Sequence, residues 1–288
     1  MKLGINLLCL TDFVTEAHLP ILRQIKAHGY DGVEVPVLSG DRAHYAWLAK
    51  ELDAIGLERC TPSVIPSPEV SPIAQDAETR AKGRQHLDWA LDCAIALGAQ
   101  SVGGPIHAPI GHFTGTGPTE SELSYGAEAH RALAERAQSN DIYLSLEHLN
   151  RFETYFLNTT AQCRDYARRV DHPALRIMYD TFHANIEDGD QVKAYETVSP
   201  HVGIVHISEN DRGIPGRGHI DFPAIIGAVK RSGYHGWVTL EAFGAGLPAI
   251  AAATRVWRPL FPDYDTLFSE SAAFIRGTWD AAGRDVAA

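Results

Sequence analysis

Four short apolar runs in this sequence each end at a side chain that can bind a metal ion, and a loop-like segment follows each of them. The end residues are Glu147, Asp180, His206 and Glu241, separated by 33, 26 and 35 residues. Each interval is close to the length of one strand–helix unit. The carboxyl ends of parallel strands converge on one mouth in a closed α/β barrel. We therefore expect these four side chains to meet at such a mouth.

The rest of the chain repeats this alternation of apolar runs and helical patterns, which is typical of a parallel series of strands and helices. We expect the first four strands over residues 3–8, 32–35, 57–63 and 101–103. Thr119 with Glu122, and Thr159 with Gln162, form capping-box patterns that predict the starts of two helices. Because such barrels commonly use about 250 residues as one domain, the chain predicts a single (β/α)8 TIM-barrel domain over residues 1–288.

One segment is too long for an ordinary loop of a barrel. Residues 242–265 follow the last predicted strand, and we expect a final helix over residues 269–279. The long segment is expected to fold over the mouth or to support a contact between subunits. Its aromatic residues Trp257, Phe261 and Tyr264 can supply an apolar surface for a second subunit, or they can pack on their own barrel.

The composition of the chain limits which classes of binding partner and which cellular compartment we expect. The chain has 36 acidic and 25 basic side chains, a net charge of −11 and no run of Lys and Arg, which argues against nucleic acid as the main partner. No stretch approaches the roughly 20 apolar residues that span a bilayer. The four cysteines are scattered without a C-x-x-C pair, which favours free thiols in a reducing compartment. Residues 1–8 resemble a first strand more than a signal peptide. We expect a cytoplasmic protein that binds a small polar molecule.

Each strand-end residue, taken singly, has a simpler explanation. Glu147 can pair with Arg151, and Asp180 can form an Asx turn. His206 can be a hydrogen-bonded core residue, and Glu241 can cap a helix. Three carboxylates at one mouth, however, repel one another unless a cation neutralises them. An oxygen-rich set with one imidazole suits Mn²⁺, Co²⁺ or Mg²⁺ better than a structural zinc ion, so we expect one divalent ion per subunit, with Mn²⁺ first.

Three segments that contain these residues resemble a known family. Residues 147–153 read Glu-His-Leu-Asn-Arg-Phe-Glu, residues 180–187 read Asp-Thr-Phe-His-Ala-Asn-Ile-Glu, and residues 206–212 read His-Ile-Ser-Glu-Asn-Asp-Arg. Each is similar to a motif of the ketose 3-epimerases, the D-tagatose, D-allulose and L-ribulose 3-epimerases of the xylose-isomerase-like barrel superfamily. Glu241 begins a Glu-Ala-Phe segment where that family usually has Glu-Pro-Phe. The resemblance is strongest over residues 147–257.

The resemblance implies a role for each matching residue. By this resemblance, the metal ligands would be Glu147, Asp180, His206 and Glu241. The two glutamates among them, Glu147 and Glu241, would also act as the acid/base pair. Glu153, His183 and Arg212 would hold the O1 to O3 end of the sugar. The resemblance further implies a homodimer or a homotetramer.

That assignment agrees with the chemistry of epimerisation. Inverting carbon 3 of a 2-ketose requires removal of a proton next to a carbonyl, and a metal ion can polarise the carbonyl and stabilise the resulting enediolate. A proton that one glutamate takes and the other returns on the opposite face inverts the centre. A single-base aldose–ketose isomerase would instead move the carbonyl.

The chain departs from the family in the segments that contact the sugar tail, so the sugar and its chain length stay open. The first strand reads Asn-Leu-Leu-Cys over residues 6–9 where the family is rich in aromatic residues. The loop after strand four contains His107, which can contact substrate or hydrogen-bond the loop backbone. The Gly-Ala-Gly tract at residues 244–246 lacks a following helix start and a nearby Lys, so we favour a free sugar over a sugar phosphate.

Two other functions remain as alternatives. The first is another metal-dependent sugar enzyme, such as an aldose–ketose isomerase, an inosose-type isomerase or a lyase on a 3-keto sugar. The second is a non-catalytic sugar-binding barrel, which needs no acid/base pair. A DNA-repair endonuclease of the same superfamily is disfavoured because the predicted mouth lacks the basic lining that DNA phosphates require.

Overall fold

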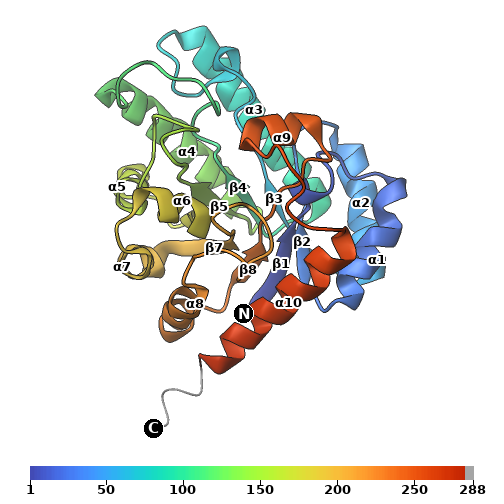
Figure 1. The fold of residues 1–288 in the computed structure, drawn as a ribbon. Coiled ribbons are helices and arrows are strands. Elements are labelled where there is room, and N and C mark those ends of the chain that lie inside the picture. Colours follow the sequence, from blue (N-terminus) through green and yellow to red (C-terminus); the bar gives the residue numbers. More distant parts are fainter. Residues whose placement is uncertain (283–288) are drawn as a thin grey trace.

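The strands of this protein form a closed parallel barrel. The computed structural model describes residues 1–282, in which eight strands pair in chain order and the last pairs with the first. Helices surround the barrel on its outside (Figure 1). The predicted (β/α)8 architecture is therefore confirmed. One connected set of buried apolar side chains extends from Leu3 to Ile275, and the single domain over residues 1–288 stays a prediction.

The elements alternate as the sequence pattern predicts. The strands are β1 Lys2–Asn6, β2 Gly32–Glu34, β3 Glu58–Pro62, β4 Ser101–Gly104, β5 Tyr143–Glu147, β6 Leu175–Asp180, β7 Val202–Ile207 and β8 Trp237–Leu240. The α-helices are α1 Leu19–Ala27, α2 Arg42–Ile55, α3 Ala77–Leu97, α4 Glu120–Gln138, α5 Thr160–Val170, α6 Thr181–Glu187, α7 Gln191–Val198, α8 Phe222–Arg231, α9 Pro248–Thr254 and α10 Tyr264–Ala281. Short 3-10 helices are η1 Leu7–Cys9, η2 Glu16–His18, η3 Pro68–Val70 and η4 Ser199–His201. In this part of the chain, no helix has both the length and the hydropathy to cross a bilayer.

Local capping fixes several element boundaries. Both predicted capping boxes are present, with Thr119 before α4 and Thr159 before α5. The first strand ends earlier than the predicted residue 8, because the Asn6 side chain accepts a hydrogen bond from the Leu8 amide and starts η1. The last helix begins at residue 264 instead of 269, because the Asp263 side chain caps it. These differences arise from side chain to backbone hydrogen bonds that an apolar pattern does not encode.

The long segment after β8 folds over the mouth of the barrel. It contains α9, and Ile250, Ala253 and Thr254 of that helix line the cavity above the strand ends together with Arg255. The predicted cover is therefore present. Helix α10 then packs against α8 and completes the outer ring (Figure 1).

An apolar layer fills the barrel below the strand ends. Met178 and Ile204 lie two residues before Asp180 and His206, so their side chains point to the same face of their strands. They pack with Cys60 and Trp237. The polar residues at the strand ends therefore lie directly above a layer of packed apolar side chains.

Helix α3 approaches the loop after β3 very closely. A Cβ added at Gly83 of α3 would overlap the backbone nitrogen of Pro72, whereas one added at Gly277 of α10 would meet no atom within 4 Å. The loop on which Gly83 packs continues from residues 62–66, which line the cavity. Glycine at position 83 therefore allows α3 to pack closely on the loop that begins in one wall of the cavity.

We expect opposite effects from two helical glycine-to-alanine substitutions. Gly83→Ala should lower the free energy of unfolding by about 1–3 kcal/mol, because the added methyl group overlaps the loop. Gly277→Ala should raise it by about 0.5–1 kcal/mol, because alanine favours the helix and the site is open. Urea denaturation followed by circular dichroism measures both. Equal effects of the two substitutions would contradict the close approach.

Candidate metal centre

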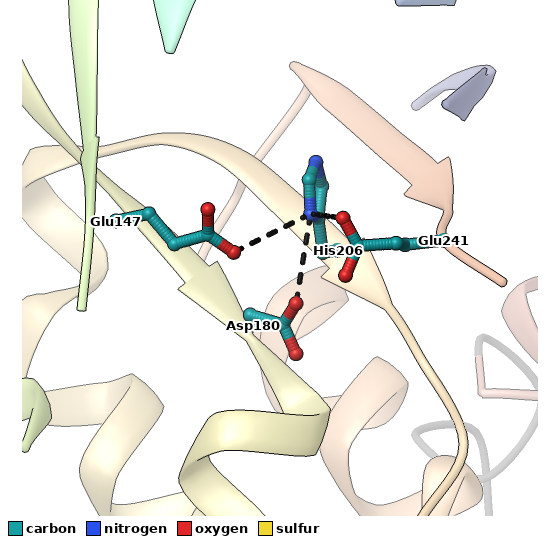
Figure 2. Close-up of side chains that lie close together, drawn as sticks. All are labelled: Glu147, Asp180, His206 and Glu241. Carbon is teal, nitrogen blue, oxygen red and sulfur yellow. Dashed lines mark ion pairs between the residues drawn. The ribbon is translucent and has the colours of Figure 1, made fainter. Parts of the chain in front are cut away.

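The four strand-end side chains meet at the mouth of the barrel, as expected. Glu147 and Asp180 are the last residues of β5 and β6, His206 lies in β7, and Glu241 directly follows β8. Each offers one ligand atom, and these atoms all lie within 4.8 Å of one another (Figure 2). All four side chains are buried. We call this set the tetrad.

The imidazole of His206 lies between the carboxylates. Its Nδ1 is 3.2 Å from Oε1 of Glu241, 3.6 Å from Oδ2 of Asp180 and 3.8 Å from Oε1 of Glu147. The dashed lines in Figure 2 mark these three ion pairs. One nitrogen and three oxygens from four different strands thus face a shared centre.

Two atoms of the tetrad are buried without a hydrogen-bond partner in residues 1–282, namely Oδ2 of Asp180 and Nδ1 of His206. The other oxygen of Asp180 accepts hydrogen bonds from the amides of Phe182 and His183 at the start of α6, at 2.6 and 3.3 Å. That capping contact fixes the carboxylate and directs Oδ2 toward the centre. Buried polar atoms without partners are costly, and a cation at the centre would satisfy both of them. The residues present therefore fit a divalent metal ion.

The electrostatics of the tetrad also favour a cation. Burial and the charge of Glu241 raise the pKa of Glu147 well above its usual value, and the same two causes raise the pKa of Asp180. Burial also opposes the charged form of Glu241, but His206 and Arg212 outweigh it and lower the pKa of that carboxyl. Two of the three carboxyl groups thus resist ionisation without more positive charge, which a divalent ion supplies.

Two neighbouring side chains that were not identified from the sequence contact the tetrad. Glu34, at the end of β2, has its carboxylate oxygens 3.0 and 3.2 Å from Nε2 of His206. Asn6, at the end of β1, donates from Nδ2 to Oε1 of Glu241 at 3.0 Å. Both follow short apolar runs, so the strand-end pattern that identified the tetrad also points to them.

The three predicted sugar-contacting residues lie beside the tetrad and line the same cavity. They are Glu153, His183 and Arg212. Arg212 donates from Nη1 to Oε2 of Glu241 at 2.6 Å, and its Nη2 lies 3.3 Å from Nε2 of His183 and 3.7 Å from Oε1 of Glu153. The guanidinium stacks on the Phe182 ring at 3.6 Å, and the backbone holds Arg212 at a φ of 67°. The structure thus brings all three next to the predicted ligands.

The tautomer of His183 follows from its backbone contact. Its Nδ1 accepts a hydrogen bond from the amide of Asn150 at 3.0 Å, so that nitrogen carries no proton. Burial and the charge of Arg212 lower the pKa of His183 well below its usual value, which keeps the ring neutral. Its Nε2 therefore carries the proton and can donate to an oxygen in the cavity, so the 3.3 Å contact of that nitrogen with Nη2 of Arg212 joins two donors and is not a hydrogen bond in this tautomer.

His107 lies in a different place from the other predicted residues. Its side chain is fully buried and stacks on Phe156, and it is not among the residues that line the cavity. Its Nε2 hydrogen-bonds the backbone carbonyl of Glu147 at 2.9 Å. Of the two expected roles of His107, this geometry favours the backbone contact, because the ring nitrogen is bound to the last residue of β5.

The cavity above the tetrad has a volume of about 330 Å³. Such a volume lies in the range of small-molecule sites. Its deep end contains the tetrad residues Glu147, His206 and Glu241, and much of the remaining wall is apolar. The apolar lining includes Leu8, Leu38, Val64, Ile65, Pro66, Ile110, Leu149, Phe243 and Ile250.

Comparison with known proteins gives one consistent group of relatives. The family model described as "Xylose isomerase-like TIM barrel" matches residues 22–275. An L-ribulose 3-epimerase from Methylomonas sp. (strain DH-1) is 31% identical over 250 residues, which is 86% of this chain and 87% of the relative. A ketose 3-epimerase from Arthrobacter globiformis is 30% identical over 96% of each chain. A solved L-ribulose 3-epimerase superposes with a TM-score of 0.93 at 29% identity, covering 100% of this chain and 99% of that one.

We expect Mn²⁺ to stabilise the folded protein through the tetrad. An ion that binds the native state at 100 times its Kd should add about 2.7 kcal/mol to the free energy of unfolding. Asp180→Asn should lose most of this gain, because it removes the charge of the carboxylate whose Oδ2 has no other partner. Glu122→Gln alters a buried carboxylate that caps α4, so it should keep the gain. Thermal unfolding with Mn²⁺ or EDTA measures the shift, and an unchanged shift in Asp180→Asn would contradict this centre.

Proposed function

This chain belongs to the xylose isomerase-like TIM barrel family, and on that premise we propose that it is a metal-dependent isomerase that inverts carbon 3 of a free ketose. Curated relatives at about this level of identity carry the names ketose 3-epimerase and L-ribulose 3-epimerase. The observation that carries the proposal is the buried tetrad, because it joins a metal-binding set to two glutamates in one sugar-sized cavity.

The acid/base step is assigned to Glu147 and Glu241. When bound, the divalent ion supplies charge stabilisation for the oxygens of the substrate. The two glutamates lie on β5 and next to β8, three strands apart around the barrel, so they approach the cavity from different sides. One carboxylate removes the proton at carbon 3, and the other carboxyl group returns a proton to the opposite face. Without a donor on that second face, the original configuration would be restored.

Orientation of the sugar is assigned to three side chains at the deep end of the cavity. Arg212 is a fixed donor because it is anchored on Glu241 and stacked on Phe182. His183 presents its protonated Nε2, and Glu153 accepts from the side chain of Asn150 while bordering the cavity. A donor and an acceptor side by side can fix two hydroxyl groups of a sugar at once.

The substrate is assigned as a free ketose, because the outer part of the cavity is mostly apolar. A phosphate group would need several cationic or amide donors at that end. A complex of the Methylomonas D-allulose 3-epimerase with D-allulose, 27% identical to this chain, supports the sugar class. Mn²⁺ is the native metal that we propose, with Co²⁺ or Mg²⁺ as substitutes, since the tetrad has three carboxylates and one imidazole. The four buried free cysteines support the proposal of a reducing compartment such as the cytoplasm.

Carbon 3 should exchange its proton with solvent during turnover. In deuterated water, Mn²⁺-loaded protein should incorporate deuterium at carbon 3 of a C5 or C6 ketose and yield its epimer. Glu147→Gln should lower the rate by about 10²–10⁴-fold, because the amide cannot transfer the proton. Glu122→Gln should keep the wild-type rate. NMR with product analysis measures both, and migration of the carbonyl or elimination would assign another sugar reaction. Absence of exchange in all C5 and C6 ketoses would contradict the proposal.

We further propose that the protein is a homodimer or a homotetramer. Of the three aromatic residues in the long segment, Phe261 and Tyr264 pack on the barrel, whereas the side chain of Trp257 is 69% exposed. Phe152 on the loop after β5 is equally exposed. Exposed aromatic side chains of this size favour a contact with a second subunit.

Light scattering coupled to size exclusion should give a mass of two or four chains of 31.4 kDa each. Trp257→Ser should shift the protein toward smaller species, because it removes apolar contact area from the proposed interface. A wild-type mass of one chain would contradict the assembly.

A further inference from the structure

We propose that Glu34 is a positioning residue that holds His206 in the tautomer and orientation needed for metal binding. The inference rests on the proposed function of the tetrad and adds a residue from β2, which contributes none of the four ligands. The proposed role of Glu34 is in metal binding. Its first test therefore measures metal affinity and does not depend on turnover.

The contact between the two residues crosses the interior of the barrel. Strands β2 and β7 do not pair with each other, yet the Glu34 carboxylate lies with Oε2 3.0 Å and Oε1 3.2 Å from Nε2 of His206. Both side chains are buried, with exposed fractions of 3% and 1%. Within residues 1–282, the imidazole is the hydrogen-bond partner of this carboxylate. Glu34 is thus a buried acid whose contacts are directed to one ring nitrogen.

This contact decides which nitrogen of His206 can bind a metal ion. A carboxylate only accepts hydrogen bonds, so Nε2 must carry a proton and donate it. In the neutral ring, the free electron pair then lies on Nδ1, which faces the three carboxylates and has no hydrogen-bond partner in this part of the chain. Metal-binding histidines commonly have such a partner on the second nitrogen.

Without Glu34, a competing arrangement becomes available. Oε1 of Glu241 lies 3.2 Å from Nδ1 of His206, so a proton on Nδ1 could be donated to that carboxylate. The internal hydrogen bond would block the nitrogen and one carboxylate oxygen together. In the neutral ring, which has a single proton, Glu34 opposes this arrangement because it holds that proton on Nε2.

The experiment compares metal affinity in three variants. Glu34→Leu removes the acceptor and should weaken Mn²⁺ binding by about 10–100-fold. Glu34→Gln keeps an amide oxygen that can accept from Nε2, so its Kd should lie between those of wild type and Glu34→Leu. Glu122→Leu is the matched control, because it removes another buried carboxylate and should destabilise α4 without changing the Kd. Isothermal titration calorimetry with Mn²⁺ measures the affinities, and Co²⁺ absorption spectra report the coordination.

A wild-type Kd in folded Glu34→Leu would overturn the proposal, whether or not the protein epimerises ketoses. If Glu34→Leu does not fold, ¹⁵N-histidine NMR of the wild-type protein loaded with diamagnetic Mg²⁺ or Zn²⁺ decides the matter. The proposal expects the His206 proton on Nε2, and a proton on Nδ1 would overturn it. Failure of the proposed function would appear separately, as wild-type protein that binds metal tightly but does not exchange carbon 3.

Discussion

The concentration of buried negative charge at one end of the barrel is the constraint on which the site depends. Three carboxyl groups of the tetrad and that of Glu34 lie within contact distance of a single imidazole. Arg212 and His206 offset part of this charge, yet the pKa of Glu147 is still raised. A cation at the centre would make such an arrangement tolerable, and the apolar layer below supports the strand ends.

The barrel allows these carboxyl groups to lie close together because each of them is held at the end of a different strand. Neighbouring strands place Asp180 beside His206 in register, and the period of two along each strand directs both side chains inward. Loops contribute the residues that we propose to orient substrate, among them Arg212 with its left-handed backbone. Rigid strand ends thus hold the proposed ligands, and the loops above them shape the cavity.

The sequence predicts the barrel and the tetrad because both depend on patterns that are local in the chain. Each ligand-type residue follows an apolar run, and parallel strands bring such ends together wherever they lie in the sequence. Glu34 has the same signal but only a three-residue strand before it, and its role depends on which ring nitrogen of His206 its carboxylate contacts, so that role could not be predicted. The location of His107 behind Glu147 depends on the loop conformation after β4, which no spacing encodes.

The groups proposed for proton transfer and the residues of the outer cavity wall lie on different segments of the chain. The carboxyl groups that would carry out proton transfer lie at the ends of β5 and β8, whereas the outer wall is built from Leu38, Pro66, Ile110 and Ile250 on other segments. Substitutions in that wall would change which tails of the proposed sugar substrate fit while leaving the strand-end carboxylates unchanged. New substrate preferences can therefore evolve on this scaffold by remodelling its rim, with the reaction itself inherited unchanged.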